Sequence, residues 1–74
     1  MKTASKFRSV FSENEIDILI EAVDGEVNLD SDYPLLFQKA YKFYRNNGIQ
    51  FIEDDEDDKY SILIDHLDKD LNLI

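Results

Sequence analysis

Apolar residues recur at helical spacing in three stretches of the chain, and the one at residues 33–47 carries five of the nine aromatic residues. At about 100° per residue, this stretch has one apolar face and one polar face. The apolar face carries Tyr33, Leu36, Phe37, Ala40, Phe43, Tyr44 and Asn47, with Tyr41 at its edge. The other apolar segments are short, so we expect them to fold by packing against this aromatic-rich helix.

A second helix is predicted over residues 12–24. Ser12 is a favourable N-cap, and Glu15, three residues later, completes a capping box. Gly25 follows the helix, where glycine readily adopts the left-handed backbone conformation that ends helices. The predicted apolar stripe of this helix consists of Ile16, Leu19, Ile20 and Val23.

A third helix is predicted over residues 57–73, directly after six consecutive acidic residues. We expect the last two acids of this run to enter the first turn, where the helix dipole favours negative charge. The predicted core stripe comprises Tyr60, Leu63, Ile64, Leu67, Leu71 and Ile74. Ile62 and Leu73 lie on the opposite face, and they are either scattered surface residues or a small contact strip.

The remaining segments complete the predicted fold. Residues 26–29 and 49–52 are expected to form two very short extended segments, and Asp30, Ser31 and Asp32 to supply the cap of the helix at 33–47. Residues 1–10 are expected to be a basic tail, part of which docks on the core through Phe7, Val10 and Phe11. Residues 1–74 are therefore predicted to be one all-α domain, a small three-helix bundle with helices at about 12–24, 33–47 and 57–73.

The charge is strongly negative and unevenly distributed. The net charge is −9; the first eleven residues carry +3 and residues 12–74 carry 5 − 17 = −12. Such a field repels nucleic acid and anionic lipid and attracts basic protein surfaces. A plainer alternative is that the charge only keeps a small domain in solution.

The composition limits the other classes of function. There is no cysteine, no long apolar run and no apolar core of a secretory signal near the start, so a cytoplasmic protein is expected. His66 and its neighbour Asp65 do not face each other on a helix, and two glycines cannot form a phosphate-binding loop. We therefore expect no enzyme and no cofactor.

A run of six acidic residues is a candidate for calcium binding. In an EF-hand loop the sixth residue is glycine and the twelfth is glutamate. A loop starting at Asp54 has Lys59 and Asp65 at these positions, and one starting at Asp24 has Leu29 in place of the glycine. No specific metal site is therefore predicted, although weak divalent binding by the acidic run stays open.

Two family resemblances bear on function. Asp30-Ser31 stands before a helix of a small acidic domain and resembles the Asp-Ser-Leu motif of acyl carrier proteins. This resemblance implies a phosphopantetheine arm on Ser31. Asp32 and Pro34 depart from that pattern.

The stretch GIQFIEDDEDD at 48–58 is similar to the end of the acidic N-terminal domain of primary sigma factors. That resemblance implies an acidic helical domain that occupies a groove built for nucleic acid.

The function expected first is a non-enzymatic module that docks on a basic groove of a nuclease, polymerase or DNA-binding protein, as an inhibitor, immunity or counter-defence protein. The alternatives are the carrier protein and a helical oligomerisation module using Ile18, Ile62 and Leu73. The predicted partner-binding residues are Glu53, Asp54, Asp55, Glu56, Asp57, Asp58, Tyr60, Asp65 and Asp68.

Overall fold

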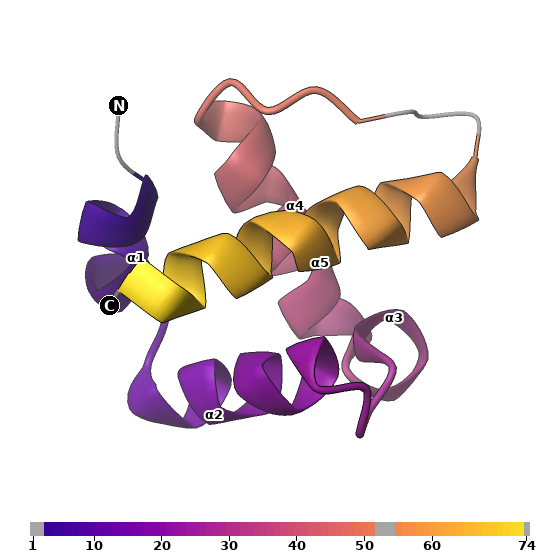
Figure 1. Ribbon diagram of the computed structural model, residues 1–74, viewed down its shortest axis with the longest axis horizontal. Coiled ribbons are helices and arrows are strands. Elements are labelled where there is room, and N and C mark those ends of the chain that lie inside the picture. Colours follow the sequence, from indigo (N-terminus) through magenta and orange to yellow (C-terminus); the bar gives the residue numbers. More distant parts are fainter. Residues whose placement is uncertain (1–2, 52–54, 74) are drawn as a thin grey trace.

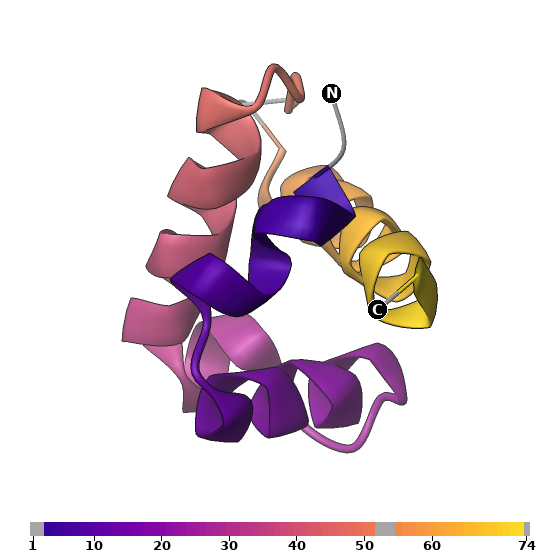
Figure 2. The ribbon, with the colours of Figure 1, turned by 90° about the vertical axis from the view of Figure 1, so that its left-hand side faces the viewer.

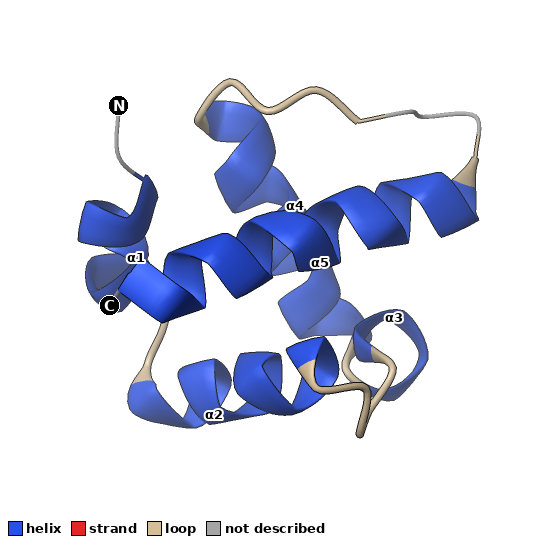
Figure 3. Ribbon diagram, in the orientation of Figure 1, coloured by secondary structure: helices blue, strands red, loops and turns tan. Residues whose placement is uncertain are grey.

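Helices make up nearly all of the regular structure (Figure 3). The computed structural model describes residues 3–51 and 55–73, and no strand occurs in this part of the chain. The helices are α1 (Thr3–Val10), α2 (Glu13–Val23), α3 (Leu29–Asp32), α4 (Pro34–Asn46) and α5 (Glu56–Leu73). The predicted all-α fold is confirmed, and the three predicted helices correspond to α2, α4 and α5.

The longest helix, α5, contacts α1, α2 and α4 (Figure 1). Seen from the side, α1 lies between α4 and α5, and α2 runs below them (Figure 2). The arrangement leaves one interior, which the apolar faces of α2, α4 and α5 fill.

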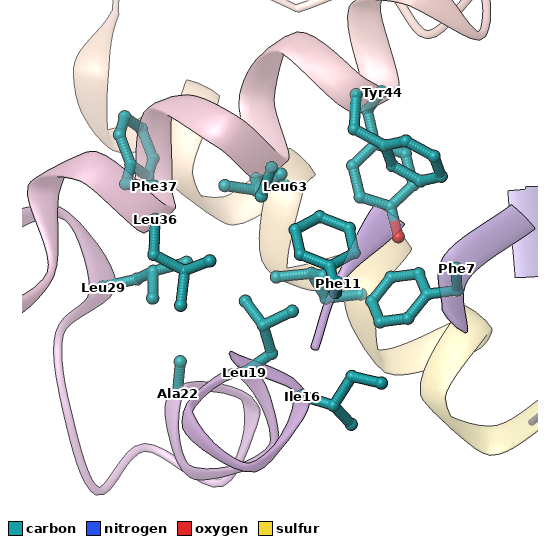
Figure 4. Close-up of a cluster of buried hydrophobic side chains, with 13 residues drawn as sticks. Phe7, Phe11, Ile16, Leu19, Ala22, Leu29, Leu36, Phe37, Tyr44 and Leu63 are labelled. Carbon is teal, nitrogen blue, oxygen red and sulfur yellow. The ribbon is translucent and has the colours of Figure 1, made fainter. Parts of the chain in front are cut away.

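The core is built around the predicted face of α4. Its buried residues, together with those of the other helices, form one cluster (Figure 4). From α4 these are Leu36, Phe37, Ala40, Phe43 and Tyr44. From α5, Leu63 and Leu67 are fully buried, and each contributes on the order of 1.5–3 kcal/mol of transfer free energy. Ile74, predicted to join them, lies outside the described residues.

The start of α2 has the predicted capping box. The Ser12 Oγ accepts a hydrogen bond from the Glu15 backbone N–H (3.2 Å), and Glu15 Oε1 accepts one from the Ser12 backbone N–H (2.9 Å). The face of α2 that points to the core differs slightly from the prediction. Ala22 is buried, whereas Ile20 is 42% exposed. The core-facing line of α2 is therefore Ile16, Leu19 and Ala22.

The N-terminal segment is a helix rather than the predicted tail. In α1, Phe7 is fully buried, and Phe11 just beyond it is also buried. Their ring centroids are 4.7 Å apart, and both rings meet Phe43 of α4 edge-on, at 6.0 and 5.4 Å. The predicted docking through these two aromatic residues is correct, whereas Val10 lies at the surface.

The segment at 26–29 is not extended along its length, because Leu29 begins α3. Asn28 caps this single turn by accepting a hydrogen bond from the Ser31 backbone N–H (3.0 Å), and Leu29 is buried. Residues 49–51 form no strand either, and residue 52 lies outside the described part of the chain. Two short strands would have been marginally stable alone, whereas a buried leucine anchors α3.

The chain turns sharply before and after α4. The predicted cap at 30–32 is wrong: Tyr33 occupies the N-cap position without a side-chain hydrogen bond, and Pro34 starts the helix as expected. Gly48 follows the helix with φ = 89°, a conformation that favours glycine. None of the described helices is long and apolar enough to cross a membrane.

Candidate functional site

The acidic run leads directly into α5. Asp55 Oδ1 accepts hydrogen bonds from the backbone N–H groups of Asp57 (3.0 Å) and Asp58 (3.2 Å), so Asp55 caps the helix. The helix begins at Glu56, one residue earlier than predicted, and three carboxylates therefore occupy its positive end. Glu53 and Asp54 lie outside the described residues.

The solvent-facing side of α5 carries further predicted site residues. At about 100° per residue, Asp58, Asp65 and Asp68 fall on the side of the helix opposite Leu63 and Leu67. All three are exposed. The Asn72 side chain donates hydrogen bonds to Asp68 on the same face (2.9 Å to the backbone oxygen and 3.3 Å to Oδ1). The structure thus places these carboxylates along one side of the helix.

The Tyr60 side chain of α5 packs against the core instead of standing free at the surface. Its hydroxyl accepts a hydrogen bond from the Leu29 backbone N–H (2.9 Å), which is an otherwise unpaired donor at the start of α3. Its ring stacks on Phe37, with centroids 6.0 Å apart. Tyr60 is therefore half-buried and holds α3 against α5, while its predicted role as an interface anchor stays a prediction.

A shallow pocket of about 320 Å³ lies where α3 meets the first turns of α5. Asp30 comes from α3, whereas Glu56 and Asp57 come from α5, and Tyr60 forms part of the wall. The sequence separates these carboxylates by more than twenty residues. Sequence analysis did not predict that Asp30 joins the acidic run, because this depends on the contact between Tyr60 and Leu29.

Acidic and basic residues are unequally divided among the helices. α1 and α4 carry only basic residues, two and three respectively. α2 and α3 carry four and two acidic residues and no basic one, and α5 carries six acidic and two basic residues. The summed formal charge is +5 on α1 and α4 and −10 on α2, α3 and α5.

Some of the basic residues engage acids locally. Lys39 Nζ lies 2.8 Å from Glu15 Oε1, and Lys59 Nζ lies 3.2 Å from Glu56 Oε1. The hydrogen bond from Lys39, followed by that from the Ser12 backbone, lowers the pKa of Glu15 below its usual value. Most acidic residues of α2, α3 and α5 nevertheless have exposed side chains.

A polar pair that the sequence did not predict lies inside the fold. The Tyr44 hydroxyl donates a 2.7 Å hydrogen bond to Asp70 Oδ2, and both residues are buried. Burial, followed by the hydrogen bond and charge of Asp70, raises the pKa of Tyr44 well above its usual range. The His66 ring lies 5.5 Å from the Tyr44 ring, between centroids. Because both side chains are buried and bonded to each other, we interpret this pair as a structural contact between α4 and α5.

An apolar pocket of about 420 Å³ lies on another side of the molecule, where α2 approaches the start of α4. Leu35 in its wall is 86% exposed, and Tyr33 is 39% exposed. Ile18 lines the same pocket together with residues of α3 and α4, and its side chain is half-buried. The sequence contains one signal for this pocket: Leu35, a large apolar residue, lies off the apolar face of its helix.

Ser31, the residue on which the carrier resemblance depends, is exposed within α3. Its backbone N–H bonds to Asn28, and Asp32 and Tyr33 separate it from the start of α4. The resemblance implies that Ser31 directly precedes the long helix. In the structure it does not. Among the described residues, no group of three acidic or histidine side chains is arranged to hold a metal ion.

The comparisons with known proteins give no family for this chain: no family model, no curated protein and no solved structure matches it.

Proposed function

We propose that this protein is a non-enzymatic interaction module whose acidic helices dock on a basic surface of a protein partner. The partner class that fits best is a protein with a groove for nucleic acid, such as a nuclease, a polymerase or a DNA-binding protein. Occupying that groove would inhibit the partner, as an immunity or counter-defence protein does. Catalysis has no part in this proposal.

The observation that carries the proposal is the separation of charge between helices. An acidic domain whose charge served only solubility would need no particular arrangement of its carboxylates. Here five of the seven basic residues of the described helices lie on α1 and α4, and α2, α3 and α5 have a large excess of acids. Asp65 and Asp68 on α5 are exposed, with Lys69 as a nearby basic residue.

The mechanism would be electrostatic attraction followed by occlusion. A field of this sign speeds the encounter with a basic surface and disfavours neutral or acidic competitors. Because exposed charges are screened beyond about 8–10 Å at ordinary ionic strength, the affinity must depend on salt. Carboxylates along α5 would take the places of phosphates in the partner's groove.

The test begins with affinity purification from the native host and mass spectrometry, which identifies the partner. Its dissociation constant is then measured by calorimetry at low and high salt. We expect binding that weakens about tenfold or more over this range, since several exposed charge pairs are screened together. An affinity that does not change with salt would contradict the proposal.

A matched pair of variants locates the surface. The variant Asp65→Asn/Asp68→Asn removes two exposed carboxylates from α5 without touching its capped first turn. The comparison variant Glu13→Gln/Glu26→Gln makes the same change in net charge at exposed positions of α2 and the loop after it, and so tests whether α5 contributes more to the contact than α2 does. We expect the α5 variant to bind more weakly, and equal effects would show that the contact does not depend on α5 in particular.

A further inference from the structure

We infer that the apolar pocket between α2 and the start of α4 anchors the partner, by accepting an apolar side chain that is flanked by lysine or arginine in a helical segment. This inference depends on the proposed function, since it identifies a second surface for the same basic partner. The pocket is lined by Ile18, Tyr33, Pro34, Leu35 and Leu36.

Leu35 is a large apolar residue that the fold leaves in contact with water. Leu35 is 86% exposed in the first turn of α4, although the same helix buries five residues on its other side. Leu35 therefore adds nothing to the core that a polar residue would not. In the lining beside it, Ile18 is half-buried and Leu36 is buried, so one additional apolar side chain placed against them would remove Leu35 and Tyr33 from water together.

The acidic residues around the pocket indicate a partner with basic residues. The helices α2 and α3, which form one wall, carry six acidic residues and no basic one. Glu15 at the rim is paired with Lys39, but Asp32 also lines the pocket and Glu21 lies one turn from Ile18, and both of these carboxylates are exposed. An apolar anchor with lysine or arginine one turn away matches this arrangement, as in amphipathic helices that bind grooves.

A second copy of the chain fits less well. If two copies met symmetrically through this pocket, the exposed Glu21 and Asp32 of both would lie at one interface, between molecules that each carry −9. Like charges brought together in this way are unfavourable. A basic partner removes that repulsion and adds attraction.

The test uses a designed amphipathic peptide of about four helical turns, with leucine on one face and lysine on the other. Two control peptides replace either leucine by alanine or lysine by glutamine. Binding is followed by amide NMR shifts of the whole chain. We expect the leucine–lysine peptide to shift resonances of Ile18, Tyr33 and Leu35 and to bind more tightly than both controls.

The decisive variant is Leu35→Ser, which changes a side chain outside the core. We expect it to weaken the leucine–lysine peptide about tenfold, which corresponds to about 1.4 kcal/mol. Leu73→Ser is the matched control, since Leu73 is 74% exposed near the end of α5. It should leave binding unchanged.

The outcomes separate this inference from the proposed function. If Leu35→Ser binds like the unchanged chain while binding still weakens with salt, the inference is wrong and the proposed function stands. If binding depends on Leu35 but the glutamine peptide binds equally well, the pocket does not select a basic segment and the inference is wrong, while the proposed function is decided separately by the salt dependence of the native partner. A dimer in light scattering that Leu35→Ser disrupts would overturn the inference in favour of a second copy.

Discussion

Asp70 is the residue whose position is hardest to reconcile with its polarity, because a carboxylate is seldom buried without a partner. Its carboxylate accepts the 2.7 Å hydrogen bond from Tyr44, and the two side chains join α5 to α4 inside the core. The contact satisfies a buried donor and a buried acceptor at once. It also joins α4 and α5 at one defined pair of positions.

Replacing Tyr44 by phenylalanine should destabilise the fold by about 1–3 kcal/mol, because Asp70 would lose a hydrogen-bond donor while remaining buried. Urea unfolding measures this loss. Tyr33→Phe is the control, since Tyr33 is 39% exposed, and we expect almost no change from it. Equal effects of the two substitutions would show that the hydrogen bond contributes little.

The same pair predicts how stability responds to alkaline pH. The pKa of Tyr44 is raised in the folded state, whereas a tyrosine in the unfolded chain ionises near about pH 10. The neutral phenol is therefore favoured by folding, and its contribution is complete below about pH 10 and lost as the pH rises beyond it. The Tyr44→Phe protein should lack this part of the alkaline loss.

Sequence analysis could have found Asp70, because the helical spacing places it beside Leu63 and Leu67. A charged residue on an apolar face indicates a buried partner, and a tyrosine on the facing helix is a suitable donor. The partner itself could not be identified from the sequence, since the pairing of Tyr44 with Asp70 depends on how α4 and α5 cross. Tyr60 is a similar case: its apolar position was predicted, but its hydrogen bond to α3 was not.

At the scale of elements, the regular stripes of α2, α4 and α5 were sufficient to predict these helices. α3 was missed because its four residues are too few to show a repeating apolar pattern, and α1 because its eight residues include few large apolar ones. Neither would be stable alone, and each depends on a buried side chain, Phe7 or Leu29. Short helices of this kind are determined by tertiary contacts rather than by local pattern.

We expect Phe7→Ala to cost about 3–5 kcal/mol, since it removes a fully buried ring from between Phe11 and Phe43. A domain of this size has roughly 4–11 kcal/mol in total, so much of its stability would be lost. Urea or thermal unfolding measures the change. Val10→Ala, at an exposed position of the same helix, should change stability by no more than about 0.5 kcal/mol. A loss below about 1 kcal/mol for Phe7→Ala would show that α1 does not close the core.

At the scale of the whole molecule, the acidic helices lie against each other, since α2 contacts α5 and the α3–α5 pocket brings Asp30 to Glu56 and Asp57. The sequence predicted the excess of acids and their concentration at 53–58. It did not predict that α3 adds carboxylates to the same region, because this depends on the tertiary fold.

Repulsion among these acids predicts that added salt stabilises the folded state. Between about 20 and 300 mM sodium chloride, we expect the free energy of unfolding to rise on the order of 1 kcal/mol, the size of a few exposed charge pairs. Urea unfolding at both salt concentrations measures it. The Asp65→Asn/Asp68→Asn variant should respond less. A decrease with salt would show that attraction between oppositely charged helices outweighs repulsion.

The placement of basic residues on α1 and α4, with acids on the other helices, has a consequence for diffusion. A positively charged surface at a distance pulls on the acidic side and pushes on the basic one, and it therefore exerts a torque as well as an attraction. The molecule would rotate as it approaches and arrive with its acidic helices already facing forward. A protein of the same net charge, spread evenly, would have to find that orientation by chance collisions.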